Sequence, residues 1–251
     1  AAGRGARLIV LPEAASQAFD SGRLDTQAQD LDGPYATGLR ELACELGVTV
    51  VAGMFRPADT VERDGKTLHR VYNTALVTGP GIHQGYDKIH TFDAFDYRES
   101  DTVRPGTELV TFEVEGATVG VAICYDIRFP HLYRTLAQAG ADFLTVPAAF
   151  TKQTGEAHWH TLLKARAIET GCFVIAPAQG GKHECGRETY GHSLIVAPWG
   201  EVIAEVDGDA PGYALATLDL AKADEARRRI PAIANQRKFS LAGLREAEAV
   251  E

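Results

Sequence analysis

Short runs of apolar and β-branched residues recur along the chain, and most of them are continuous rather than alternating with polar residues. Such runs are typical of strands that are covered on both faces. The pattern therefore predicts strands over 7–13, 48–55, 72–79, 117–124, 142–150, 172–179, 192–206 and 212–220. The tight "APWGE" turn divides one of these regions, 192–206, and predicts a β-hairpin there.

Amphipathic helices are predicted between several of the strands. Leucines and alanines recur with helical spacing over 35–46, 131–139 and 156–170. The last of these segments ends at Gly171, and glycine commonly terminates helices. Because strand and helix alternate from 117 to 179, we expect a βαβαβ unit with parallel strands.

The chain shows no internal repeat, no low-complexity linker and no shift in composition, so we expect a single domain over 1–251. Its first residues, "AAGRGARLIVLPE", resemble the last turn of a helix that leads into a strand. We therefore expect a further strand and helix upstream of residue 1. The polar stretch over 80–108 is too long for a simple connection, and loops of this length are often functional.

Composition excludes several classes of protein. The chain is 45% hydrophobic and 24% charged, which is ordinary for a soluble globular protein, and its net charge of −9 is unsuited to nucleic-acid binding. No apolar run is long enough to span a membrane, and no segment resembles a signal peptide. The four cysteines are scattered without C-x-x-C spacing, so neither a disulfide framework nor a zinc site is expected. A cytoplasmic setting is the simplest interpretation.

Three reactive groups stand at the ends of probable strands or next to them, namely Glu13, Lys88 and Cys124. A carboxylate can take the proton of a thiol, and an ammonium can stabilise negative charge on an attacked carbonyl oxygen. Each residue also has an ordinary structural explanation, because a cysteine at the end of an apolar strand usually packs in the core. Periodicity alone does not decide between these interpretations.

A set of short motifs in a fixed order does distinguish the catalytic interpretation of these residues from the structural one. It comprises "LPE" at 11–13, "YDKIH" at 86–90, "RES" at 98–100, "ICYDIRFPHL" at 123–132 and "GHS…PWGEV" at 191–202. In this order the motifs resemble the nitrilase superfamily of carbon–nitrogen hydrolases, over residues 7 to about 240. The resemblance implies an α-β-β-α sandwich of two packed mixed sheets with helices outside. It also implies pairing into a four-layered αββα-αββα homodimer or a larger assembly.

The resemblance also implies roles for individual residues. Glu13 matches the general base, Lys88 the lysine that holds the oxyanion, and Cys124 the nucleophile. Glu99 matches a second glutamate that lies beside the lysine and helps to position the substrate. The backbone N–H of Tyr125 is the natural partner of Lys88 in an oxyanion hole.

The closest similarity is to the Nit branch, which contains deaminated glutathione amidases and ω-amidases. This implies hydrolysis of a primary amide in a small carboxylate-bearing substrate to acid and ammonia through a cysteine thioester. Arginine binds carboxylates with two hydrogen bonds, so Arg128 is the candidate for holding the substrate carboxylate, with Thr154 as a weaker hydroxyl donor. The alternative for Arg128 is a structural ion pair with Asp126.

Other functions remain open from the residues alone. The same Glu13, Lys88 and Cys124 could serve a nitrilase or an N-carbamoyl amino acid amidohydrolase. A papain-like hydrolase would instead need a histidine partner for Cys124, and a non-catalytic scaffold would need none of the three.

No metal or cofactor is expected. His158 and His160 stand two apart on a predicted helix and would point to different faces, while His192 is expected to be buried and hydrogen-bonded near the site. The chain has neither a phosphate-binding G-x-x-x-x-G-K-[ST] loop nor a G-x-G-x-x-G motif after a strand. The expected ligand is therefore a small-molecule amide alone.

Overall fold

The fold is built on two β-sheets, and it was obtained as a computed structural model that describes residues 1–19, 21–208 and 210–240. One sheet has the order β1-β2-β3-β4 and consists of β1 (Leu8–Val10), β2 (Thr49–Arg63), β3 (Lys66–Gly79) and β4 (Ile82–Asp87). The other has the order β14-β13-β10-β9-β8-β7 and consists of β7 (Thr111–Val114), β8 (Ala117–Val121), β9 (Phe143–Thr145), β10 (Phe173–Ala176), β13 (Leu194–Val196) and β14 (Val202–Glu205).

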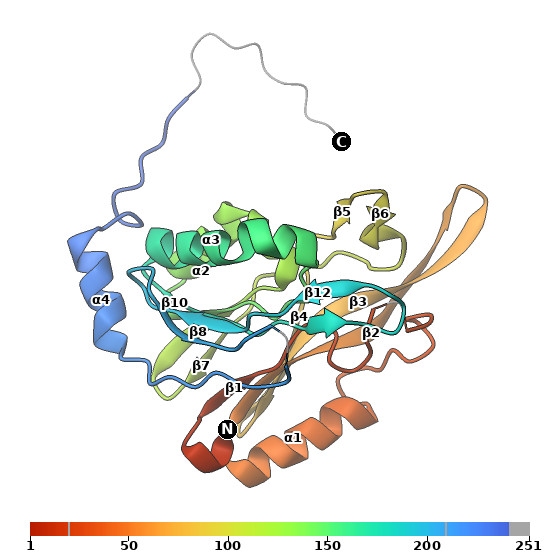
Figure 1. The fold of residues 1–251 in the computed structure, drawn as a ribbon, viewed down its shortest axis with the longest axis horizontal. Helices are drawn as coiled ribbons and strands as arrows, with labels where there is room; N and C mark the ends of the chain where they lie inside the picture. Colours follow the sequence, from red (N-terminus) through yellow and green to blue (C-terminus); the bar gives the residue numbers. More distant parts are fainter. Residues whose placement is uncertain (20, 209, 241–251) are drawn as a thin grey trace.

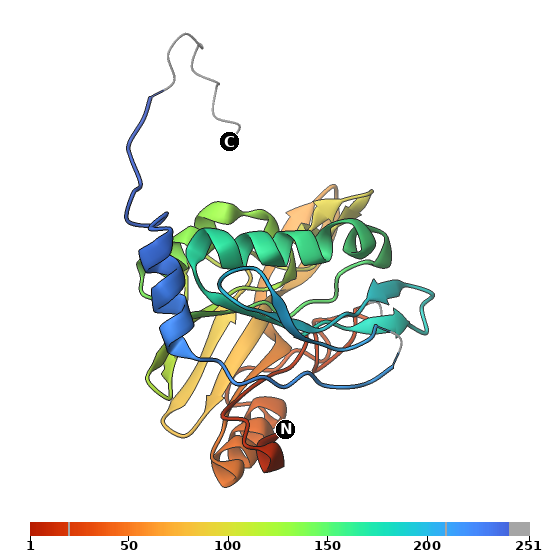
Figure 2. The same cartoon turned by 60° about the vertical axis from the view of Figure 1, so that its left-hand side comes forward.

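Helices cover the outer faces of the two sheets, as the views in Figures 1 and 2 show. On one side, α1 (Pro34–Leu46) packs against β2 and β3; on the other, α2 (Pro130–Gln138) and α3 (Lys152–Thr170) lie over the six-stranded sheet. Between the sheets, an apolar layer joins side chains of both, among them Val51, Val77, Val119 and Phe173. The expected α-β-β-α sandwich is confirmed.

The local sequence explains where these helices begin and end. Both α1 and α2 begin with a proline, whose fixed φ suits the first helical turn and whose missing N–H is not needed there. Gly171 ends α3 in the left-handed conformation, with its N–H donating to the Ala167 carbonyl. The predicted βαβαβ unit is also confirmed, since β8, β9 and β10 pair in parallel.

The predicted hairpin in 192–206 is formed by the antiparallel strands β13 and β14.

The strand predicted over 212–220 is wrong, because residues 212–219 pair with none of the described strands and α4 (Leu220–Arg229) begins at 220. An apolar pattern makes a strand only where a sheet edge offers hydrogen-bonding partners.

The polar stretch over 80–108 contains more regular structure than its composition indicates. It includes β4, the small ribbon of β5 (Asp93–Ala94) and β6 (Tyr97–Arg98), and the 3-10 helix η2 (Glu99–Asp101). A second ribbon joins β11 (Gly180–Lys182) and β12 (Glu188–Tyr190). In the described part of the chain, no helix is both long and apolar enough to cross a membrane.

Candidate active site

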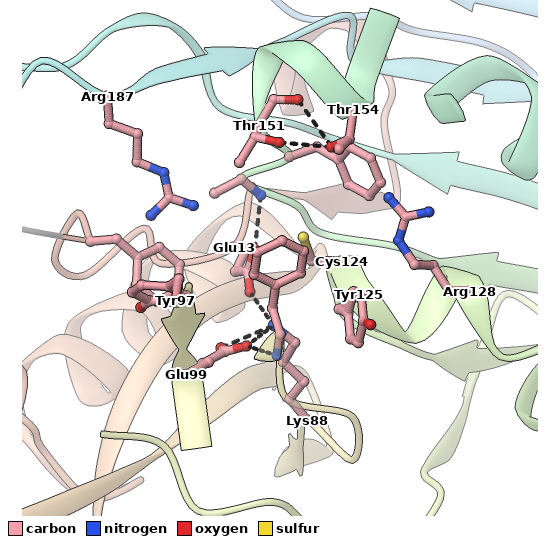
Figure 3. A pocket seen from close by; sticks show the side chains of 14 residues that line it. Glu13, Lys88, Tyr97, Glu99, Cys124, Tyr125, Arg128, Thr151, Thr154 and Arg187 are labelled. Carbon is pink, nitrogen blue, oxygen red and sulfur yellow. Dashed lines mark hydrogen bonds and ion pairs between the residues drawn. The ribbon is translucent and has the colours of Figure 1, made fainter. Parts of the chain in front are cut away.

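Three segments from the ends of strands meet at one pocket, which Figure 3 shows from close by. Glu13 follows β1, Lys88 directly follows β4, and Cys124 begins the 3-10 helix η3 (Cys124–Arg128) soon after β8. The first two strands belong to the four-stranded sheet and β8 belongs to the six-stranded sheet. The packing of the two sheets therefore brings the three residues together.

The segment that carries Glu13 lies directly against β2. A Cβ atom at Gly53 would stand 2.4 Å from the Ala14 nitrogen, so only glycine allows this approach. The side-chain amide of Gln179 also donates to the Glu13 carbonyl oxygen, at 2.7 Å. These contacts hold the backbone from which the Glu13 carboxylate enters the pocket.

Both oxygens of the Glu13 carboxylate accept hydrogen bonds, although the residue is only 2% exposed. Its Oε1 accepts from Asn73 Nδ2 at 2.7 Å and from Lys88 Nζ at 3.1 Å. Its Oε2 accepts from the backbone N–H of Ala149 at 2.8 Å. A buried charge needs such partners to offset the loss of water, so the carboxylate is held in one orientation.

Lys88 lies between two carboxylates. Besides Glu13, its Nζ donates to both oxygens of Glu99, at 3.0 and 2.9 Å. Burial by itself lowers the pKa of Lys88, but the negative charges of Glu13 and Glu99 outweigh it and hold this pKa well above the usual value. Lys88 therefore carries a fixed positive charge next to Cys124.

Glu99 and Asn73 complete this buried cluster. Glu99 Oε2 also accepts the backbone N–H of Phe92, and Asn73 Nδ2 lies 3.3 Å from Glu99 Oε1. Asn73 was not among the predicted site residues. Its one signal in the sequence is a side-chain amide within the predicted strand "YNTALVTG".

Cys124 lies at a sharp turn between strand and helix. Its φ is +43°, a conformation that costs a non-glycine residue about 1–3 kcal/mol and is concentrated at functional sites. Asp126, which is fully buried, holds this turn because its carboxylate accepts from the Ile123 N–H at 2.9 Å, from the Tyr86 hydroxyl at 2.7 Å and from the His90 N–H at 3.1 Å.

The surroundings of the Cys124 side chain favour the protonated thiol. Burial raises its pKa well above the usual value, and the negative charge of Glu13 raises it further, while the Lys88 charge acts in the opposite direction. A thiol in this state needs a base before it can attack, and Glu13 is the carboxylate beside it.

Tyr125 is the second residue of η3, and the first N–H groups of a helix have no acceptor within the helix. The Tyr125 N–H therefore has no acceptor within η3.

Arg128 and Thr154 both line the same pocket. The Arg128 guanidinium lies over the rings of Tyr125 and Phe150, at 5.8 and 5.2 Å from their centroids. The alternative of an ion pair with Asp126 is wrong, because the carboxylate of Asp126 is used by the turn and by His90. The Thr154 hydroxyl forms a 2.7 Å hydrogen bond with that of Thr151.

Further lining residues were missed by the sequence reasoning. They come mainly from loops and from the two small ribbons, and they are Phe19, Phe92, Tyr97, Ala149, Phe150, Thr151 and Arg187. Figure 3 shows Arg187 on the opposite side of the pocket from Arg128. No histidine is among the described residues that line the pocket, which argues against a papain-like pair.

The sequence model of one protein family, described as carbon–nitrogen hydrolase, matches residues 1–228. The chain belongs to this family. A carbon–nitrogen hydrolase with this site is an amidohydrolase that acts on non-peptide carbon–nitrogen bonds.

Individual relatives of this carbon–nitrogen hydrolase agree with the match. This chain is 39% identical over 239 residues to the deaminated glutathione amidase of Synechocystis, and the match covers 92% of this chain and 86% of the relative. It is 37% identical to the deaminated glutathione amidase of Bos taurus, covering 94% and 74%. The crystal structure of Saccharomyces cerevisiae Nit3, a member of branch 10 of the nitrilase superfamily, superposes with a TM-score of 0.80 at 27% identity, covering 93% of this chain and 83% of Nit3.

The structure confirms one expectation about the histidines and contradicts another. His158 and His160 do point apart, since His158 contacts Arg128 while His160 contacts Glu205. The expectation that His192 is buried near the site is wrong: its side chain is 30% exposed and is not part of the lining of the pocket around Cys124.

Proposed function

We propose that this carbon–nitrogen hydrolase cleaves the amide of a small carboxylate-bearing substrate through a thioester on Cys124. The observation that carries the proposal is the convergence of Glu13, Lys88 and Cys124 on one pocket that Arg128 also lines. Relatives named deaminated glutathione amidase, at 37–39% identity over most of the chain, support the choice of substrate.

The first half of the reaction forms the thioester. Glu13 takes the proton from the Cys124 thiol as the sulfur attacks the amide carbonyl carbon. The Lys88 ammonium and the Tyr125 N–H stabilise the negative charge that develops on the carbonyl oxygen. When the tetrahedral intermediate collapses, the carbon–nitrogen bond breaks and protonated Glu13 gives its proton to the leaving nitrogen.

The second half releases the acid. Glu13, again a carboxylate, takes a proton from water as the water oxygen attacks the thioester carbonyl. Collapse of the second tetrahedral intermediate breaks the carbon–sulfur bond and returns the proton to the thiol. Glu99 acts through Lys88, because its two hydrogen bonds hold the ammonium in place.

Deaminated glutathione fits the charges at the pocket. It is an α-keto acid joined through an amide to cysteinylglycine, so a carboxylate stands on each side of the bond that breaks. Arg128 and Arg187 stand on two sides of the pocket (Figure 3). The amide of this substrate is secondary, so its leaving group is the amine of cysteinylglycine, and the expectation of a primary amide that releases ammonia applies only to a short ω-amide.

A panel of substrates tests this function. Purified enzyme is incubated with deaminated glutathione, a short α-keto ω-amide, an aliphatic nitrile and an N-carbamoyl amino acid, and the products are quantified by mass spectrometry. We expect hydrolysis of one or both amides and none of the nitrile or the carbamoyl compound. Turnover of the nitrile without the amides would overturn the proposal.

Removing the Arg128 charge should weaken substrate binding selectively. A hydrogen bond to a charged group contributes about 1.5–3 kcal/mol, so Arg128→Gln is expected to lower kcat/KM for deaminated glutathione about 10- to 100-fold, mainly through KM. A small neutral amide should be affected little. Arg40→Gln, on the exposed side of α1, is the matched control. An equal loss on both substrates would show that Arg128 does not hold a carboxylate.

We also propose that the enzyme forms a homodimer and works in the cytoplasm. Exposed apolar side chains support an interface, since Ile168 is 54% exposed and lies against Gly200, next to the half-exposed Trp199.

A further inference from the structure

Three side chains that the proposed reaction does not use meet on another part of the molecule. His160 comes from the middle of α3, His192 from the segment between β12 and β13, and Glu205 from the end of β14. None of the three lines the pocket around Cys124. Their ligand atoms all lie within 4.8 Å of one another.

The donor atoms are those of a metal site, and in this structure hydrogen bonds hold them close together. His160 Nε2 lies 2.8 Å and His192 Nδ1 lies 3.0 Å from Glu205 Oε1. Zinc binds histidine nitrogen and carboxylate oxygen at about 2.0–2.2 Å, so neighbouring ligand atoms in a tetrahedral site stand about 3.3–3.6 Å apart, and only a small outward movement of these side chains would admit the ion. Two histidines and one glutamate are a known zinc ligand set that leaves a further position for water.

The His192 ring is held in place before any ion binds. It stacks on the Tyr190 ring, with centroids 4.2 Å apart and an interplanar angle of 29°. The ring also lies close to Gly208, where an added Cβ atom would stand 3.1 Å from His192 Nε2. This fixed orientation removes much of the entropic cost of ordering a ligand.

The backbone of His192 is tied to the helix that carries His160. His192 has a φ of +53°, and its carbonyl oxygen accepts from the indole N–H of Trp159 at 2.9 Å. Trp159 is fully buried and directly precedes His160. The two ligands from distant parts of the chain therefore share one rigid support.

Solvent reaches the cluster. The side chains of His160, His192 and Glu205 are 30%, 30% and 34% exposed. An ion can enter, and water can fill the remaining positions of its coordination shell.

We propose that His160, His192 and Glu205 form a binding site for a divalent transition-metal ion of the zinc class, separate from the pocket around Cys124. The site would join α3 to β14.

Cobalt(II) is the probe, because its visible absorption reports the ligands. Titrating the purified protein with Co²⁺ is expected to give a saturable band typical of nitrogen and oxygen ligands, and excess Zn²⁺ should abolish it. His160→Ala and His192→Asn should each weaken binding at least about tenfold, since even partners outside the coordination shell contribute 10- to 100-fold. Asparagine tolerates the left-handed backbone at position 192, which protects folding.

His158→Ala is the matched control, because it removes a histidine from the same helix but outside the cluster, and it should leave cobalt binding unchanged. Circular dichroism checks the fold of each variant. Three results would overturn the proposal: no saturable binding, unchanged affinity in both variants, or an intense thiolate-to-cobalt band that places the ion on cysteine. In each of these cases the cluster is a hydrogen-bonded group only.

Discussion

Replacing Cys124 by alanine is expected to lower amide hydrolysis by at least about 10⁴-fold, because Cys124 is the only cysteine among the described residues that line the pocket and the proposed acyl intermediate forms on its sulfur. Rapid acid quenching of the wild-type enzyme with substrate should give a mass increase equal to the acyl group. Peptide mapping should place that mass on Cys124, and the variant should show none.

The matched controls are Cys44→Ala and Cys185→Ala, which remove exposed thiols and should retain full activity. Circular dichroism is needed for Cys124→Ala, because alanine at a φ of +43° keeps the backbone strain of the wild type. Substantial turnover by a folded Cys124→Ala enzyme, or an acyl group on another cysteine, would contradict the mechanism.

The Glu13→Gln substitution should have opposite effects on catalysis and on thiol ionisation. Loss of the general base is expected to lower kcat about 10²- to 10⁴-fold. The negative charge of Glu13 raises the pKa of Cys124, so its removal should shift that pKa downward. The pH dependence of alkylation of Cys124 by iodoacetamide measures this shift, and the midpoint should move to lower pH.

This pair of measurements distinguishes a base from a structural residue. A residue that only held the pocket together would lower kcat without moving the alkylation midpoint in that direction. Glu45→Gln, on the exposed face of α1, is the control for loss of one carboxylate. Unchanged kcat in Glu13→Gln, or a midpoint at higher pH, would contradict the proposed role.

Much of the fold follows from patterns that are local in the sequence. The continuous apolar runs predicted the buried strands β8, β9 and β10 because each is covered on both faces. By contrast, β4 has the sequence "IHQGYD" and was missed, because a strand that carries so many polar groups has no apolar run. The wrong strand over 212–220 shows the reverse error, since pattern does not reveal whether a partner strand exists.

The residues of the candidate site likewise fall into those that the sequence predicted and those that it missed. Glu13, Lys88, Glu99 and Cys124 were found because each lies in a short motif whose order along the chain resembles a family. Asn73 lies in no such motif. Its hydrogen bonds with Glu13 and Glu99 join residues that are distant in the sequence and meet only in the folded chain. The rest of the lining comes from loops, whose approach to the pocket depends on how the sheets pack.

The division of the pocket between two sheets has a consequence for the newly made protein. Glu13 and Lys88 follow strands of the four-stranded sheet, which is complete once residue 87 has been synthesised, and Cys124 follows β8 of the other. The reactive thiol is therefore made last and acquires its base only when the two layers dock. Hydrolytic activity should thus report on docking, and a chain with only its first layer folded would be catalytically silent.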